Sequence, residues 1–125
     1  GTLVKYLKPY PELIENKEMY IDVVNDLNDY LNQKNITKKI IFYIPKYTRL
    51  AYKHINHPNL TQLNNLRNLV QTTALKNNFK FIDGSKIYHS RKNPLDVFYY
   101  QLPTHFNIKG YDILADELQK AINDN

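Results

Sequence analysis

Two short apolar runs, each placed between stretches with helical spacing, constrain the fold of this chain most strongly. The runs cover residues 40–44 (IIFYI) and 79–82 (FKFI), and they are followed by Pro45 and by Asp83-Gly84 respectively. Short runs rich in β-branched and aromatic residues, bounded by polar residues or proline, are typical of strands buried on both faces. We therefore expect one strand in each run.

Three longer stretches have apolar residues at helical spacing and alternate with the two strands. The first runs from residue 17 to residue 32 or 34, the second from 60 to 76, and the third from 108 or 109 to 122. This order predicts an α/β fold in which a parallel sheet has helices on both faces. Two strands are few for a closed domain of this class. The 125 residues are therefore expected to form a single domain or the C-terminal part of a larger one.

The first and last helices are each expected to turn an apolar side toward the core. In the first helix this side consists of Tyr20, Val23, Val24, Leu27, Tyr30 and Leu31, with Asp22, Asp26 and Asp29 on the other side. In the last helix it consists of Tyr111, Leu114, Leu118, Ala121 and Ile122. Residues 46–59 are expected to form a long loop, and residues 97–100 a less regular stretch that Pro103 breaks.

Charge and composition narrow the choice of partners. The net charge is +5, but the lysines are spread along the chain, and the longest basic runs are pairs such as Lys38-Lys39 and Arg91-Lys92. Without a basic cluster or a recognition motif, a nucleic-acid partner is not expected. No apolar run approaches the roughly 20 residues of a membrane-spanning helix. The absence of cysteine excludes disulfides, thiol catalysis and cysteine-ligated zinc.

The stretch that carries chemistry is 104–115 (THFNIKGYDILA), at the start of the last helix. Asn107 is expected to cap this helix, because its side chain can accept from the free amides of the first turn. Gly110 would let the helix pack closely. His105 then lies in the loop before the helix, where its ring can project over the carboxyl edge of the sheet. The positive helix end disfavours an imidazolium, so the ring would stay neutral and able to accept a serine proton.

The same stretch resembles the last conserved block of SGNH (GDSL-type) hydrolases and acyltransferases, including the alginate acetyltransferase-like branch. In that block a catalytic histidine precedes a helix in a pattern close to His-x-Asn-x-x-Gly. Residues 43–45 (YIP) and 81–83 (FID) are similar to two strand ends of the family, so the resemblance spans about 17–122 in the expected order. It implies a three-layer, flavodoxin-like fold with His105 as the general base. It also implies an acyl-ester substrate, such as an O-acetylated glycan, with no cofactor or metal, and an extracytoplasmic location.

The sequence departs from the family at the acid that usually precedes the histidine by two or three positions. Leu102 and Pro103 stand there, and neither can orient an imidazole. The site is then a Ser-His dyad, uses another acid, or is degenerate. Asp96 is the nearest upstream carboxylate, and Asp83 is a second alternative that more simply ends a strand.

The nucleophile is the second departure. The chain has only two serines, Ser85 and Ser90, and the family's Gly-Asp-Ser block is missing. Residues 83–85 read Asp-Gly-Ser, which is a different order after a late strand, so Ser85 is interpreted as a turn residue and only secondarily as a nucleophile. The missing serine could lie on either side of this chain. The rival interpretation is a non-catalytic relative that uses the fold to bind a protein or a glycan.

Three further features of the sequence give weaker indications of function or origin. His54 and His57 lie close together in a loop, but no Asp, Glu or Cys accompanies them, so a metal site is not expected. Several tyrosines gather near strand ends and loops, which favours a glycan-facing or a structural role; they are Tyr43, Tyr47, Tyr52, Tyr88, Tyr99 and Tyr100. The start, 1–3 (GTL), reads as a cut fragment or a tag scar, so a targeting segment would have been removed.

An incomplete sheet would leave an edge and an apolar face uncovered. We therefore expect self-association, completion by a missing segment of the same protein, or a cover formed by residues 2–10, which contain Leu3, Val4, Tyr6 and Leu7.

Overall fold

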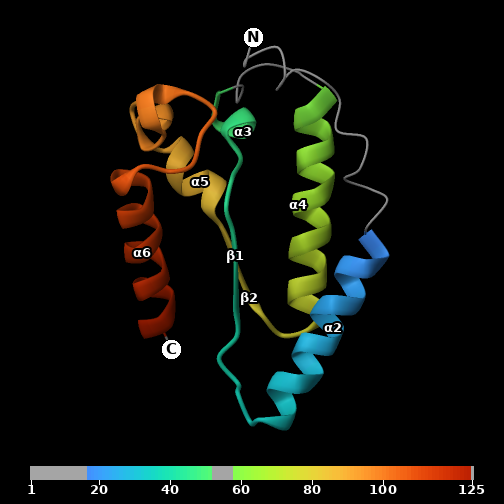
Figure 1. Cartoon of the computed structure of the whole chain (residues 1–125). Coiled ribbons are helices and arrows are strands. Elements are labelled where there is room, and N and C mark those ends of the chain that lie inside the picture. Colours follow the sequence, from blue (N-terminus) through green and yellow to red (C-terminus); the bar gives the residue numbers. More distant parts are fainter. Residues whose placement is uncertain (1–16, 52–57, 125) are drawn as a thin grey trace.

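The computed structural model describes residues 17–51 and 58–124, which form three long helices, two short strands and several short helical segments (Figure 1). The expected cover by residues 2–10 and the pair His54 and His57 lie outside these residues. In chain order the elements are α2 (Lys17–Gln33), β1 (Ile40–Tyr43), α3 (Tyr47–Ala51), α4 (Pro58–Lys76), β2 (Lys80–Asp83), α5 (Gly84–His89), the 3₁₀ turns Pro94–Val97 and Tyr99–Gln101, and α6 (Ile108–Asn123).

The strands pair in parallel, which confirms the predicted direction. Ile40 lies opposite Lys80 and Tyr43 lies opposite Asp83, so both strands end at the same edge. The second strand is shifted by one residue from its predicted range. The expectation that β1 is buried on both faces is wrong, since all four of its residues are only half-buried. Within the described residues the sheet has two strands, so each strand keeps an unpaired edge.

Helices lie on either side of the strands. Figure 1 shows α2 and α4 on one side and α6 on the other. Two clusters of buried side chains hold the elements together: one contains Val24, Ala74 and Phe79, and the other contains Leu50, Tyr88, Val97, Phe98 and Phe106. The chain is therefore a mixed α/β protein built mostly of helices around a small parallel sheet. None of the helices in the described ranges is long and apolar enough to cross a membrane.

Two short helices occupy segments in which none was predicted. Part of the expected loop 46–59 is α3, and α5 begins directly after β2. Asp83 starts α5, because its carboxylate accepts from the backbone N of Ser85 at 3.0 Å. Gly84 permits this sharp turn: a Cβ at that position would meet the carbonyl oxygen of Tyr43 and the ring of Phe42. A six-residue helix has too few turns to show a helical period in the sequence.

The last helix has its predicted bounds to within a residue, but two of its predicted inward residues are exposed. Tyr111 and Ile122 are both open to solvent, whereas Ala121 is buried. The covered side of α6 runs through Gly110, half-buried Leu114 and Ala121. Tyr111 and Ile122 each follow a residue of this side, which places them about 100° around the helix.

The first helix also buries less of its apolar side than predicted. Val24 is buried, and Tyr20 and Leu31 pack partly against its cluster. Val23, Leu27 and Tyr30 are exposed, contrary to the expectation. These residues share one apolar arc with Val24, but the described elements cover only one side of that arc.

Candidate functional site

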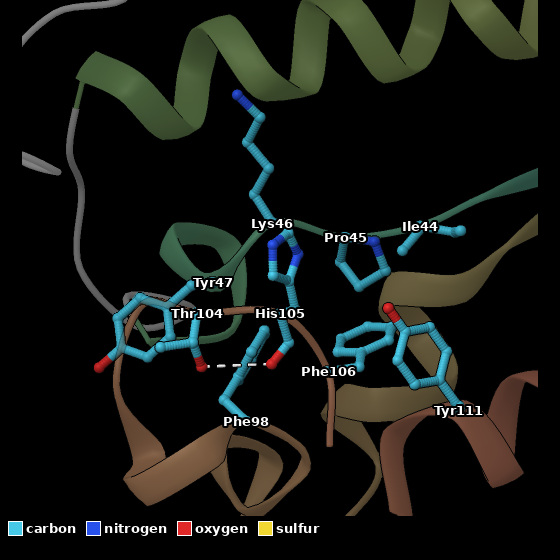
Figure 2. Close-up of a pocket in the computed structure, with 9 residues that line it drawn as sticks. All are labelled: Ile44, Pro45, Lys46, Tyr47, Phe98, Thr104, His105, Phe106 and Tyr111. Atoms are coloured by element: carbon cyan, nitrogen blue, oxygen red, sulfur yellow. Dashed lines mark hydrogen bonds between the residues drawn. The ribbon is translucent and has the colours of Figure 1, made fainter. Parts of the chain in front are cut away.

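A pocket of about 340 Å³ opens at the carboxyl end of β1. Residues 44–47 line it directly after the strand, and residues 104–106 line it from the loop before α6. Phe98 and Tyr111 complete the lining (Figure 2). His105 therefore lies in the loop before the last helix and beside the carboxyl edge of the sheet, as the sequence predicts.

Aromatic rings form a continuous wall of this pocket. Tyr47 meets Phe98 edge-on with ring centroids 5.2 Å apart, and Phe98 lies 5.3 Å from Phe106. Phe106 in turn meets Tyr111 edge-on at 5.8 Å. Such rings offer an apolar surface for an acyl chain or for the face of a sugar. Polar side-chain groups at the pocket come from Lys46, Thr104 and His105 and from the hydroxyls of Tyr47 and Tyr111.

His105 presents an open imidazole to this pocket. Its side chain is exposed, and among the described residues none forms a hydrogen bond with its ring. Its backbone oxygen accepts from the hydroxyl of Thr104 at 3.2 Å, which Figure 2 shows as a dashed line. That hydroxyl also reaches the carbonyl of Leu102 at 3.1 Å. The loop is thus held through its backbone, and the ring takes no part in these hydrogen bonds.

Asn107 fixes the loop on the helix side of His105. Its Oδ1 accepts from the backbone N of Gly110 at 3.0 Å, which confirms the predicted cap of α6. Its Nδ2 donates to the carbonyl of Asp96 at 2.8 Å, and its backbone N donates to the carbonyl of Val97 at 2.8 Å. One residue therefore ties the start of the helix to the 3₁₀ turn that precedes the loop.

Gly110 allows α6 to approach that turn closely. A Cβ there would lie 2.8 Å from two side-chain atoms of Phe106 and 2.9 Å from the carbonyl oxygen of Val97. The hydroxyl of Tyr88 donates to the carbonyl of Gly110 at 2.9 Å. Burial raises the pKa of Tyr88 to about 12, with a smaller rise from Glu117 and an opposing effect of Arg91. Tyr88 therefore stays a neutral donor that holds the first turn of the helix.

The structure does not bring Asp96 to the imidazole. Both of its carboxylate oxygens accept from Arg91, at 3.0 and 2.9 Å, and one accepts from Lys109 at 3.1 Å. Burial raises the pKa of this carboxyl. The hydrogen bonds from Lys109 and Arg91, together with their positive charges, lower the pKa by more than burial raises it, so that it lies below its ordinary value. Asp96 supports the loop through these ion pairs and through its backbone bond to Asn107.

Ser85 and Asp83 lie together but outside the described lining of the His105 pocket. The side chain of Ser85 is almost fully buried, and its hydroxyl donates to Asp83 Oδ1. Asp83 also pairs with Arg67 at 3.4 Å. Ser85 thus acts as a turn residue at the start of α5. The other serine, Ser90, donates to the carbonyl of Ile87 at 2.7 Å at the end of the same helix.

Among the described lining residues there is neither a serine nor a carboxylate. The sequence singled out His105 and, among the tyrosines near strand ends, Tyr47. It did not indicate Phe98, Phe106 or Lys46 as pocket residues. Little in the sequence indicated that the two phenylalanines line a pocket. Each lies in an irregular segment, where an apolar residue is buried only if a tertiary contact covers it.

Within residues 17–51 and 58–124, no three His, Asp or Glu side chains come together in a way that could hold a metal ion. Comparisons of the chain with protein-family models, with curated proteins and with solved structures give no match.

Proposed function

We propose that this chain supplies the general base and the aromatic wall of an acyl-ester site of the SGNH type, in a hydrolase or an O-acyltransferase. We propose that the complete domain has a three-layer fold. Its remaining strands and its serine would come from a segment outside these 125 residues. The substrate class is an acyl ester, with an O-acetyl group on a glycan as the leading case.

The observation that carries the proposal is the open imidazole of His105 beside an aromatic pocket at the carboxyl edge of a parallel sheet. Ligands of open α/β sheets bind outside the carboxyl ends of the strands. A general base needs a ring that is positioned but not consumed by structural hydrogen bonds. The backbone of the loop is fixed by Thr104 and Asn107, and the His105 ring stays available.

The chemistry assigned to His105 is proton transfer. As a serine oxygen bonds to the ester carbonyl carbon, the imidazole takes the hydroxyl proton, and it then gives that proton to the departing alkoxide. The acyl group is transferred from the serine to water in a hydrolase, or to an acceptor hydroxyl in a transferase. The rings of Tyr47, Phe98 and Tyr111 would hold the apolar part of the substrate against the reacting bond.

The first test measures binding at the pocket by this chain. Acetylated xylo-oligosaccharide and its deacetylated form are titrated into isotopically labelled protein, and the resonances of His105, Tyr47 and Tyr111 are followed. We expect shifts with the acetylated form that are lost in Tyr111→Ala. Equal shifts with both forms, or shifts confined to other residues, would contradict an acyl-ester pocket here.

The second test concerns turnover. This chain alone should not hydrolyse p-nitrophenyl acetate faster than the His105→Ala variant, because no serine lines the described part of the pocket. A longer polypeptide from the same gene that contains a Gly-Asp-Ser block should hydrolyse it, and His105→Ala should lower kcat by at least about 100-fold. Turnover by the chain alone that disappears in Ser85→Ala would identify Ser85 as the nucleophile and overturn the proposal.

A second candidate function is non-catalytic binding of a glycan or a protein. It is favoured by the lack of a described carboxylate beside His105 and by the use of Asp96 and Asp83 in structural ion pairs. Two results together would distinguish this function from the enzyme. They are binding of a glycan at the pocket and the absence of a Gly-Asp-Ser block on either side of this chain in the gene.

A further inference from the structure

The outer side of α2 carries a strip of exposed apolar residues that is separate from the pocket. Its members are Met19, Val23, Leu27 and Tyr30, which are 63, 58, 44 and 55% exposed. At about 100° per residue they fall within about 80° of arc and run along three turns of the helix. The buried residue Val24 lies farther round, toward the core. Figure 1 shows α2 at the outer edge of the structure beside α4.

A row of aspartates borders this strip on the side away from the core. Asp22, Asp26 and Asp29 are spaced i, i+4 and i+7, and all three are exposed. None of the salt bridges between described residues involves them. The helix contains four acidic residues and one lysine, whereas the whole chain has a net charge of +5. The negative charge beside the apolar strip is therefore a local feature of α2.

We propose that the α2 strip, defined as Met19, Val23, Leu27 and Tyr30, is the docking surface for a basic amphipathic helix of another protein. A helix with apolar residues at i, i+4, i+8 and i+11 has the same spacing as the strip. Lysine or arginine along one flank of that helix would face the aspartate row. Apolar contact supplies the attraction, and charge complementarity orients the partner and raises the rate of association.

The same geometry disfavours a second copy of this chain as the occupant. In a two-fold pair of antiparallel helices, both copies present the same surface. Each flank of the strip in one copy then lies beside the same flank in the other copy. The three aspartates of one copy would then lie beside the three of the other. Like charges placed in this way repel, so the complement of this surface is a helix of opposite charge.

The test uses a synthetic peptide of about 18 residues, which is long enough to form a helix. It carries leucines at the spacing of the strip, lysines along the adjoining row and alanines elsewhere, and a second peptide has glutamate in place of every lysine. Binding to the whole chain is measured by fluorescence anisotropy at low and at high NaCl. We expect the lysine peptide to bind, the glutamate peptide to bind at least about tenfold more weakly, and high salt to reduce the difference.

Two variants and a control locate the binding surface. Val23→Ser combined with Leu27→Ser should weaken binding of the lysine peptide by about tenfold or more, which corresponds to the loss of two exposed apolar contacts. Replacing Asp22, Asp26 and Asp29 by lysine should reverse the preference, so that the glutamate peptide binds better. Ile108→Ser removes an exposed apolar side chain on α6 and should leave binding unchanged. Circular dichroism checks that each variant is folded.

Three outcomes would overturn the proposal. The first is equal binding of the two peptides to the wild-type chain, or no binding of either. The second is unchanged binding in the serine and lysine variants. The third is a dimer in sedimentation that Val23→Ser with Leu27→Ser dissociates, since a second copy would then occupy the strip. Because the strip lies apart from the described pocket lining, none of these results depends on the acyl-ester proposal.

Discussion

Replacing Gly110 by alanine tests the close packing that positions the loop of His105. An added Cβ would lie 2.8 Å from Cβ and Cγ of Phe106 and 2.9 Å from the carbonyl oxygen of Val97. Comfortable contacts between carbon atoms are about 3.5–4.0 Å. Phe106 cannot yield easily, because its ring is packed against Tyr88 at 5.0 Å and Phe98 at 5.3 Å. The helix and the aromatic cluster must therefore move apart.

Two opposing effects set the size of the loss. Alanine is favoured over glycine inside a helix by about 1 kcal/mol. Overpacking in a filled core costs about 1–3 kcal/mol, and the upper end applies here because both neighbours of the new methyl are fixed. We expect Gly110→Ala to lower the free energy of unfolding by about 2 kcal/mol, and Tm by about 8 °C for a chain of this length.

Urea denaturation followed by circular dichroism measures this loss. Asp116→Ala is the matched control, since it makes an alanine at an exposed position of the same helix and should change stability by less than about 0.5 kcal/mol. The amide resonances of residues 105–107 should also shift in Gly110→Ala. A variant as stable as the wild type, with unshifted resonances at Phe106, would refute the packing argument.

The remaining predictions concern the contacts beside His105. Asn107→Ala should cost about 1–2 kcal/mol in urea denaturation, because it removes the cap to the N of Gly110 and the bond to the carbonyl of Asp96; Asn107→Asp keeps the cap acceptor and should lose less. Since the folded pKa of Asp96 is lowered from 3.8, its contribution to stability is present above that pH and is lost as the pH falls through the folded value. The gap in stability between the wild type and Asp96→Asn should accordingly narrow below about pH 4, and a gap that is constant with pH would show that the ion pairs with Arg91 and Lys109 contribute nothing.

Local features of the chain were readable in advance because they depend on neighbours only a few residues away. The two apolar runs specify strands, and the helical spacing over 60–76 and 108–122 specifies helices. Asn107 caps α6 through a contact three residues away, which is why the position of His105 before the helix could be inferred. The same kind of local contact, from Asp83 to Ser85, starts α5, but the helix is too short to reveal itself by period.

The tertiary structure decided what covers each face and which distant residues meet. Helical spacing grouped Val23 and Leu27 with Val24, but only the packing against Ala74 and Phe79 selects the side that is buried. Spacing could not show that Asp96 pairs with Arg91 and Lys109 rather than with His105, or that Ser85 turns inward. The pocket wall likewise joins Tyr47 in α3 to Phe98 between the two 3₁₀ turns, a contact between segments far apart in the chain that depends on how α3 packs against the turn Pro94–Val97 and has no local signature. By itself, the sequence determined the three long helices, the two strands and the loop that holds the histidine. The packing of those elements determined the surfaces on which a ligand or a partner could bind.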